Sequence, residues 1–320
     1  MIRKTFFLSL LFPCSLLAAD LTDPWLMIEK AGQAARQLNY KGLYVYQAGG
    51  SFSSLQIMHT NYGPAGEFAR VVQLDGVPRE ILRQGNDVVI YQPKSEKIVI
   101  DKRRLQHGFP AVLPKISEEL RSNYQAKAMG SERIGGRDAM LVMLEPRDKY
   151  RYSSKMWMDR ESGLLLKMAL LDDRDEVVEQ AAFSQLLLMS NAGMDWFHPE
   201  VQPGKSYEIS PEAKILPSSA QDDSWIITQL PPGFYKTDQV LRKIPGKAYP
   251  VSQLVFCDGF ASVSLFIEPL LQGTIPRIGS FSQGATNIVV NVTGGRQIVV
   301  MGEVPAITLT QIANAVSFRK

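Results

Sequence analysis

The sequence offers few side chains of the types and spacings that perform chemistry. Its three histidines, His59, His107 and His198, lie far apart, and none stands at metal-ligand spacing from a cysteine or another histidine. Gly204-Lys205-Ser206 resembles the end of a phosphate-binding loop but lacks the glycine that should precede it by five residues. Many of the carboxylates fall in predicted turns, where solvent-exposed acidic residues are expected. We therefore expect no enzyme, no metal and no cofactor.

Apolar residues between 138 and 171 are better candidates for a site. An antiparallel sheet with one wet face alternates apolar and polar residues. Here Met140 and Val142 would share one face of a strand, yet Leu141 on the other face is apolar as well. Both faces must therefore be covered, whether by a helix, by another domain or by an apolar ligand.

Methionines are concentrated in this stretch, and flexible thioethers suit a lining that accepts variable acyl chains. Core packing of a curved sheet is the simpler interpretation, and an apolar concavity open to lipid is the functional one. The candidate lipid-binding residues are Met140, Val142, Met156, Met158, Leu166 and Met168.

Three consecutive basic residues, Lys102, Arg103 and Arg104, follow a predicted strand. Guanidinium and ammonium groups bind phosphate well, so these residues are candidates for contact with a lipid headgroup. Solvated loop charge is the simpler explanation of the same pattern.

Periodicity predicts the elements that would position these residues. Asp23 and Pro24 suit an N-cap and a first helical residue, and the apolar spacing that follows predicts a helix ending near Asn39. From Tyr40 to Leu188 the period becomes two, with short turns. Short turns join antiparallel neighbours, so this stretch predicts an antiparallel meander with a short helix within it at 116–124.

A second domain is expected beyond a stretch rich in proline and serine. Residues 20–198 would form the first domain, 199–223 a linker and 224–320 the second domain. Within the second domain, Thr293-Gly294-Gly295 predicts the turn of a hairpin. Thr308 and Gln311 have the spacing of a capping box and predict the start of a terminal helix.

Residues 1–19 have the pattern of a cleaved secretory signal peptide. Arg3 and Lys4 precede an apolar run, and Ala18-Ala19 suit a cleavage site. The run is too short to span a membrane as a helix. We therefore expect the chain from Asp20 onward to work outside the cytoplasm.

Charge and cysteine content limit the partners. The net charge of +3 includes Arg3 and Lys4, so the chain without its signal peptide carries +1 and has no general affinity for nucleic acid. Cys257 then has no partner for an intramolecular disulfide. The sequence leaves open whether the chain forms a homo-oligomer.

Four stretches together resemble the RseB/MucB family, which comprises periplasmic regulators of envelope-stress sigma factors. The first runs from Leu144-x-Pro146-x-Asp148-x-Tyr150-Arg151-Tyr152 through Lys155-Met-Trp157-Met-Asp159 to Ser162-Gly163-Leu-Leu-Leu-Lys167. The others are Gln229-Leu-Pro-Pro-Gly233-Phe234, Asp258-Gly259-Phe-Ala261 through Pro269, and Gly302-Glu303-Val304-Pro305. The similarity extends over nearly the whole chain after the signal peptide.

The resemblance implies an α+β fold. The first domain would be a lipoprotein-carrier-like half-open antiparallel β-barrel wrapped around helices, and the second a smaller α+β domain with an antiparallel sheet. Proteins of this family bind the periplasmic region of a membrane-spanning anti-sigma factor and shield it from regulated proteolysis. Lipopolysaccharide or related lipid is thought to release them.

We therefore expect a non-enzymatic negative regulator that senses lipid through its first domain. The rival interpretation is a periplasmic carrier of lipid or lipoprotein, which would not need the second domain. The resemblance assigns contact with the anti-sigma factor mainly to that domain. Its candidate partner-binding residues are Phe260, Val263, Ile288, Val290, Ile298 and Val300.

Overall fold

A computed structural model describes residues 23–318 apart from 86, 93–96, 102–107, 112, 114, 191–192, 200–207, 211–213, 217–224, 244–246, 272 and 274. The expected signal peptide and the basic residues Lys102, Arg103 and Arg104 lie outside the described residues. Within the described residues, no helix is long and apolar enough to cross a membrane.

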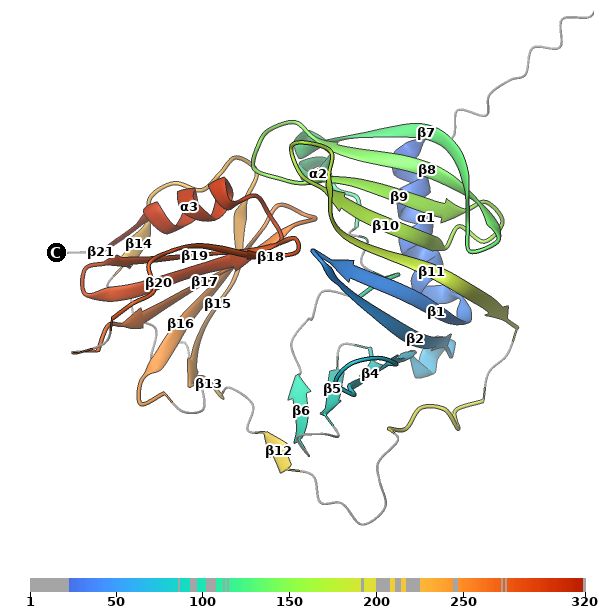
Figure 1. Cartoon of the computed structure of the whole chain (residues 1–320), viewed down its shortest axis with the longest axis horizontal. Helices are drawn as coiled ribbons and strands as arrows, with labels where there is room; N and C mark the ends of the chain where they lie inside the picture. The colour runs from blue at the N-terminus through green and yellow to red at the C-terminus, as the bar shows by residue number, and fades with distance from the viewer. Residues whose placement is uncertain are drawn as a thin grey trace, which may run out of the picture.

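One large sheet dominates the first domain (Figure 1). Its order is β12-β6-β5-β4-β3-β2-β1-β11-β10-β9-β8-β7, and every pair is antiparallel except β12 with β6. Because β12 and β7 at its two ends do not pair, the barrel is open. Its strands are β1 (Asn39–Ala48), β2 (Ser51–Asn61), β3 (Glu67–Gln73), β4 (Glu80–Gln84), β5 (Asp87–Gln92), β6 (Lys97–Asp101), β7 (Tyr124–Ile134), β8 (Arg137–Pro146), β9 (Ser153–Asp159), β10 (Leu165–Leu171), β11 (Val177–Met189) and β12 (Glu208–Ser210).

Two helices of the first domain begin where the sequence predicts. Helix α1 (Pro24–Gln37) is capped by Asp23, which accepts a hydrogen bond from the Trp25 amide, and it crosses one face of the sheet (Figure 1). Helix α2 (Glu118–Asn123) is capped in the same way by Ser117. A short 3-10 turn, η1 (Gly63–Ala65), joins β2 to β3. The predicted half-open antiparallel sheet around helices is therefore confirmed.

Strands β8 to β10 are buried on both faces, as their apolar pattern predicts. Val142 and Met156 pair on one face and pack against Ile28 of α1. Leu141 and Trp157 pair on the opposite face and are buried too. The chain's own side chains cover both faces at this point.

His59 of β2 is a core residue. Its ring stacks on Tyr40, with Nδ1 2.7 Å from the Leu38 carbonyl and Nε2 3.1 Å from Glu67. Although burial opposes the shift, His59 and Arg83 lower the pKa of Glu67 to about 2. The histidine therefore fixes the start of β1 against β2.

The second domain is a smaller sheet with one helix (Figure 1). Its order is β13-β15-β16-β17-β20-β19-β18, and β14 pairs separately with β21. The core lies between the sheet and α3, as the predicted α+β class requires. The elements are β13 (Lys214–Leu216), β14 (Trp225–Ile227), β15 (Tyr235–Lys243), β16 (Pro250–Cys257), β17 (Ser262–Pro269), β18 (Gly279–Gln283), β19 (Thr286–Thr293), β20 (Arg296–Gly302), α3 (Ala306–Asn314) and β21 (Val316–Phe318).

The β19–β20 hairpin forms as predicted, but the predicted capping box at the start of α3 is wrong. The helix begins after Pro305, which makes no side-chain cap. Thr308 lies inside the first turn and is fully buried, and its hydroxyl donates a 2.7 Å hydrogen bond to the Tyr150 carbonyl of the first domain. The hydroxyl that would cap the helix in a capping box thus makes a hydrogen bond between the domains instead.

The predicted linker, residues 199–223, contains two short strands. β12 pairs with β6 of the first sheet, and β13 pairs with β15 of the second. The chain therefore leaves one sheet and joins the other between Ser210 and Lys214. The division at 199–223 stays a prediction.

Candidate functional site at the junction of the two domains

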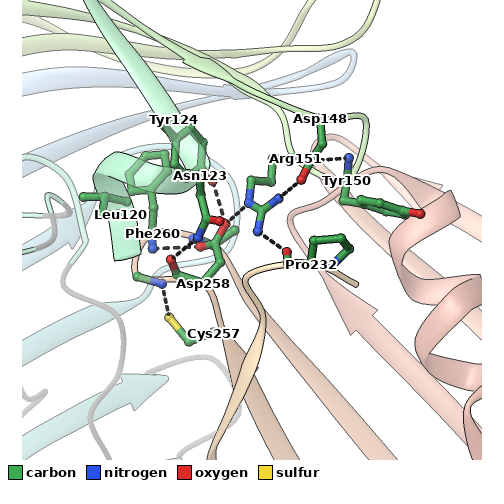
Figure 2. A network of polar contacts seen from close by, with 12 residues as sticks. Leu120, Asn123, Tyr124, Asp148, Tyr150, Arg151, Pro232, Cys257, Asp258 and Phe260 are labelled. Atoms are coloured by element: carbon green, nitrogen blue, oxygen red, sulfur yellow. Dashed lines mark hydrogen bonds and ion pairs between the residues drawn. The ribbon is translucent and has the colours of Figure 1, made fainter. Parts of the chain in front are cut away.

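The two domains meet in a network of polar contacts (Figure 2). The first domain contributes the end of α2, the start of β7 and the loop between β8 and β9. The second contributes the segment before β15 and the turn between β16 and β17. Figure 2 shows these segments converging on the carboxylate of Asp258.

An ion pair between Arg151 and Asp258 lies at the centre of this junction. Both side chains are fully shielded from solvent. The Arg151 guanidinium donates to Asp258 Oδ2, to Asp148 and to the Pro232 carbonyl. The Tyr124 hydroxyl donates to the same Asp258 oxygen over 2.9 Å. Each of the three guanidinium nitrogens thus has a hydrogen-bond acceptor, as a buried arginine requires.

The second oxygen of Asp258 holds its own turn. Oδ1 accepts the amides of Phe260 and Ala261 at 2.8 and 2.7 Å. Although burial opposes the shift, Asp258 raises the pKa of Arg151, so the guanidinium stays charged. Burial, and then the charge of Asp258, raise the pKa of Tyr124, which stays a neutral donor. The protonation states therefore match the hydrogen bonds.

Aromatic rings enclose the ion pair. The Arg151 guanidinium lies 4.9 Å from the centre of the Phe234 ring, and Phe260 meets Tyr124 edge-on at 5.9 Å. Gly233 has a φ of +76°, and a Cβ there would lie 2.2 Å from Asn123 Oδ1. Only glycine fits that position, so the segment 231–234 can lie directly against the first domain.

Further hydrogen bonds extend the junction on the side of α3. Asn287 of β19 donates to the Tyr152 hydroxyl over 2.8 Å and to the Val304 carbonyl over 2.8 Å. Thr308 contacts Tyr150 as described above. Residues 148, 150, 151 and 152 of one loop thus all take part in the junction or orient a residue that does.

A half-open cavity of about 480 Å³ lies in the first domain beside the junction. Its lining is mostly apolar, and Glu303 contributes to it from the second domain. The β18–β19 turn approaches here, since a Cβ at Gly284 would lie 2.7 Å from Ala48 Cβ. The apolar lining residues are Tyr44, Leu55, Phe109, Met168, Leu170 and Ala181.

Both carboxyl groups that line the cavity have a raised pKa: burial raises the pKa of Glu303, and Glu179 is shifted as well. Glu179 is half-buried and interacts with the Tyr46 hydroxyl and the Ala285 amide. Burial and then the charge of Glu303 raise the pKa of Glu179 to about 7, against an ordinary value of 4.5. Arg79 lines the same cavity. We therefore expect the contact between the domains at this point to depend on the protonation of Glu179.

The candidate lipid-binding residues fall mainly in the core. Val142, Met156, Met158 and Met168 pack with α1 and α2, and Leu166 packs in a neighbouring cluster. Met140 is half-buried. Among the six, Met168 lines the cavity. The assignment of these residues to lipid stays a prediction.

The candidate partner-binding residues do not lie on one common surface; they fall into three groups. Val263, Ile298 and Val300 are fully buried in the core of the second domain, and Phe260 lies in the junction. Ile288 and Val290 are half-buried. Contact of this set with a partner stays a prediction.

The four stretches that carry the family resemblance meet at the junction. Asp148 to Tyr152, Pro232 to Phe234, Asp258 to Phe260 and Glu303 to Val304 all contact one another there or line the adjacent cavity. The pairing of Arg151 with Asp258 was not predicted from the sequence. The available indications were a charged residue between two tyrosines and an Asp-Gly turn after an apolar strand.

Comparison with known proteins shows that both domains match models of the same family. The MucB/RseB N-terminal domain model matches residues 24–201, and the MucB/RseB C-terminal domain model matches residues 219–317. The chain belongs to the MucB/RseB family.

Relatives and solved structures match more than nine-tenths of this chain. The sigma factor AlgU regulatory protein MucB of Pseudomonas aeruginosa is 31% identical, over 92% of this chain and 90% of its own. The crystal structure of MucB in complex with MucA(peri) matches with a TM-score of 0.73 and 28% identity, over 93% and 100% of the two chains. A crystal structure of MucB alone matches at 0.63 and 27%, over 92% and 97%.

Because the ion pair is buried, replacing one carboxylate oxygen of Asp258 with an amide group should strongly lower the stability of the fold. In Asp258→Asn, Arg151 would lose its fully buried counter-charge and keep only the partly exposed Asp148. Breaking a buried pair in this way typically costs about 3–5 kcal/mol of unfolding free energy. Urea denaturation followed by circular dichroism measures it. Asp238→Asn is the matched control, since Asp238 is exposed in the same domain. Equal denaturation midpoints for Asp258→Asn and the unaltered chain would contradict the central role of the pair.

Glu179 predicts a pH dependence. Because its pKa is raised to about 7, the folded junction favours the protonated carboxyl. Its contribution to stability is fully present below pH 4.5 and is lost as the pH rises through 7. Between about pH 5 and pH 8, the unaltered chain should therefore lose stability relative to Glu179→Gln. Glu176→Gln, at an exposed turn, should follow the unaltered chain. Parallel curves for Glu179→Gln and the unaltered chain would refute this assignment.

Proposed function

We propose that the protein is a non-enzymatic negative regulator that works in the periplasm. It binds the periplasmic region of a membrane-spanning anti-sigma factor and shields that region from regulated proteolysis. The observation that carries the proposal is the likeness to MucB in complex with MucA(peri), which covers 93% of this chain. The signal-peptide pattern of residues 1–19 supports the location.

The docked domains are the form that we propose for partner binding. The present structure is more similar to MucB in its complex than to MucB alone, at nearly equal coverage. A binding surface built from two domains is preorganised only while the domains are held together. The Arg151–Asp258 pair and its surrounding hydrogen bonds supply that restraint.

We propose that the cavity beside the junction receives the lipid signal. It is mostly apolar, it is open to solvent, and Glu303 of the second domain lies at its edge. An acyl chain entering it would contact the first domain next to the docked turn at Gly284. A lipid that binds the undocked form better would release the partner by shifting the population.

A lipid or lipoprotein carrier is the second candidate, and the cavity favours it. Such a carrier would need the first domain alone. The regulator is preferred because a complete second domain is held to the cavity domain by a buried ion pair.

Reconstituted proteolysis tests the regulator. The chain from Asp20 onward should bind the purified periplasmic region of its anti-sigma factor and slow its cleavage by the first regulatory protease. A fragment that ends near Gln221 should bind lipid but give no protection, because the second domain would be missing. Full protection by that fragment would place the inhibitory surface in the first domain.

A cavity-filling change tests the lipid site. Ala181 lines the cavity, whereas Ala182 is next to it on β11 and points to the opposite face. Ala181→Phe should therefore weaken lipopolysaccharide-induced release of the anti-sigma region by about tenfold, since the ring occupies the acyl site. Ala182→Phe should respond as the unaltered chain does. If both variants release the anti-sigma region as the unaltered chain does, the lipid does not bind in this cavity.

A further inference from the structure

Two carboxylates from different domains meet in the cavity beside the junction. Glu179 of β11 accepts a hydrogen bond from the amide of Ala285, in the turn between β18 and β19. Glu303 directly follows Gly302, which pairs with Asn287, two residues beyond Ala285. Both glutamates line the same cavity. Strand register in the second sheet therefore brings Glu303 to the turn that contacts Glu179 of the first.

No cation in the described part of the chain neutralises these two carboxylates. Glu179 interacts with two neutral donors, the Tyr46 hydroxyl and the Ala285 amide. Among the described residues, no lysine or arginine forms an ion pair with Glu179 or Glu303, and this includes Arg79, which lines the same cavity. The cavity therefore presents negative charge that a positively charged ligand would neutralise.

The remainder of the lining suits a ligand that is both cationic and apolar. Tyr44, Tyr46 and Phe109 line the cavity, and the ring centres of Tyr44 and Phe109 lie 5.2 Å apart. The faces of aromatic rings attract ammonium groups, and aromatic cages are a recurring way to bind them. Leu55 and Met168 add aliphatic surface. The same cavity thus offers negative charge, aromatic rings and room for an apolar chain.

We propose that the cavity selects an amphiphile whose polar end carries an ammonium group. The ammonium would lie between Glu179 and Glu303, and the apolar chain would lie against Leu55 and Met168. The inference rests on the proposed lipid cavity and adds the chemical class of the ligand. Aminophospholipids and simple long-chain amines share this chemistry.

Such a ligand would act on the docking of the domains in the direction opposite to the release signal. Its ammonium would be held by one carboxylate from each domain, so it would bind the docked form better and increase the population of that form. A lipid without an ammonium group would gain nothing from Glu303. The polar end of the ligand would therefore decide whether the cavity favours docking or release.

Calorimetric titration without any protein partner tests the selection. Dodecylamine and dodecanoate have chains of equal length and polar ends of opposite charge. At about pH 7.5, the chain from Asp20 onward should bind dodecylamine at least about tenfold more tightly than dodecanoate. The preference should shrink at about pH 5.5, because Glu179, with a pKa raised to about 7, is then mostly protonated. Ala181→Phe should block both ligands, whereas Ala182→Phe should block neither.

Removing the carboxylates should remove the preference and leave the apolar site intact. Glu179→Gln/Glu303→Gln should bind dodecylamine and dodecanoate with affinities within about threefold of each other. Glu303→Gln alone should already weaken dodecylamine binding, although Glu303 belongs to the second domain. Glu29→Gln/Glu176→Gln is the matched control, since it removes two exposed carboxylates and changes the net charge equally.

Lysophosphatidylethanolamine and lysophosphatidylglycerol distinguish the two sources of the ammonium group. Preference for the first supports an aminophospholipid, and preference confined to dodecylamine supports a simple amine. Equal binding of dodecylamine and dodecanoate, or a preference that survives in Glu179→Gln/Glu303→Gln, would overturn the inference. The proposed lipid cavity would still stand in that case if Ala181→Phe blocked both ligands. Failure of both ligands to bind the unaltered chain would overturn the inference and the lipid cavity together.

Discussion

The buried ion pair between Arg151 and Asp258 is the constraint on which the arrangement of the two domains depends. A buried charge is tolerated only when its partner and its hydrogen bonds are complete. Here one partner comes from each domain, and neither side chain reaches solvent. Partial separation of the two domains would therefore leave the charge of Asp258 uncompensated. Such all-or-none contacts are suited to a regulator with two states.

The cavity is lined by residues of both domains, and this gives the proposed regulation a route. Glu179 belongs to the sheet that forms the cavity, and the Ala285 amide of the second domain bonds to it. Anything that changes the filling or the charge of the cavity therefore acts on a contact between domains. The partner, on this account, binds a surface that exists only while the domains are docked. Lipid and partner would then compete through the docking equilibrium, not through a shared site.

Local rules account for what the sequence could predict. Asp23 and Ser117 cap helices through their own next turn, and Gly294-Gly295 closes a hairpin, so these features need no distant residue. The junction could not be found this way, because Arg151 and Asp258 are 107 residues apart and each looks like a turn residue. Thr308 was misassigned for the same reason. Its spacing to Gln311 fits a capping box, but its hydroxyl donates a hydrogen bond to the distant Tyr150 carbonyl. Periodicity placed the methionines in two-sided strands without saying whether a ligand or a helix covers them.

A double-mutant cycle on partner binding tests the central claim most directly. Affinity for the anti-sigma region would be measured for the unaltered chain, Arg151→Met, Asp258→Leu and the double variant. If the pair holds the binding-competent form together, Arg151→Met leaves the buried charge of Asp258 without a counter-charge, and Asp258→Leu leaves Arg151 with Asp148 alone. The double change removes both buried charges. The account predicts a coupling energy of more than about 1 kcal/mol between the two positions. Single effects that simply add, or affinity that is unchanged in all three variants, would contradict it.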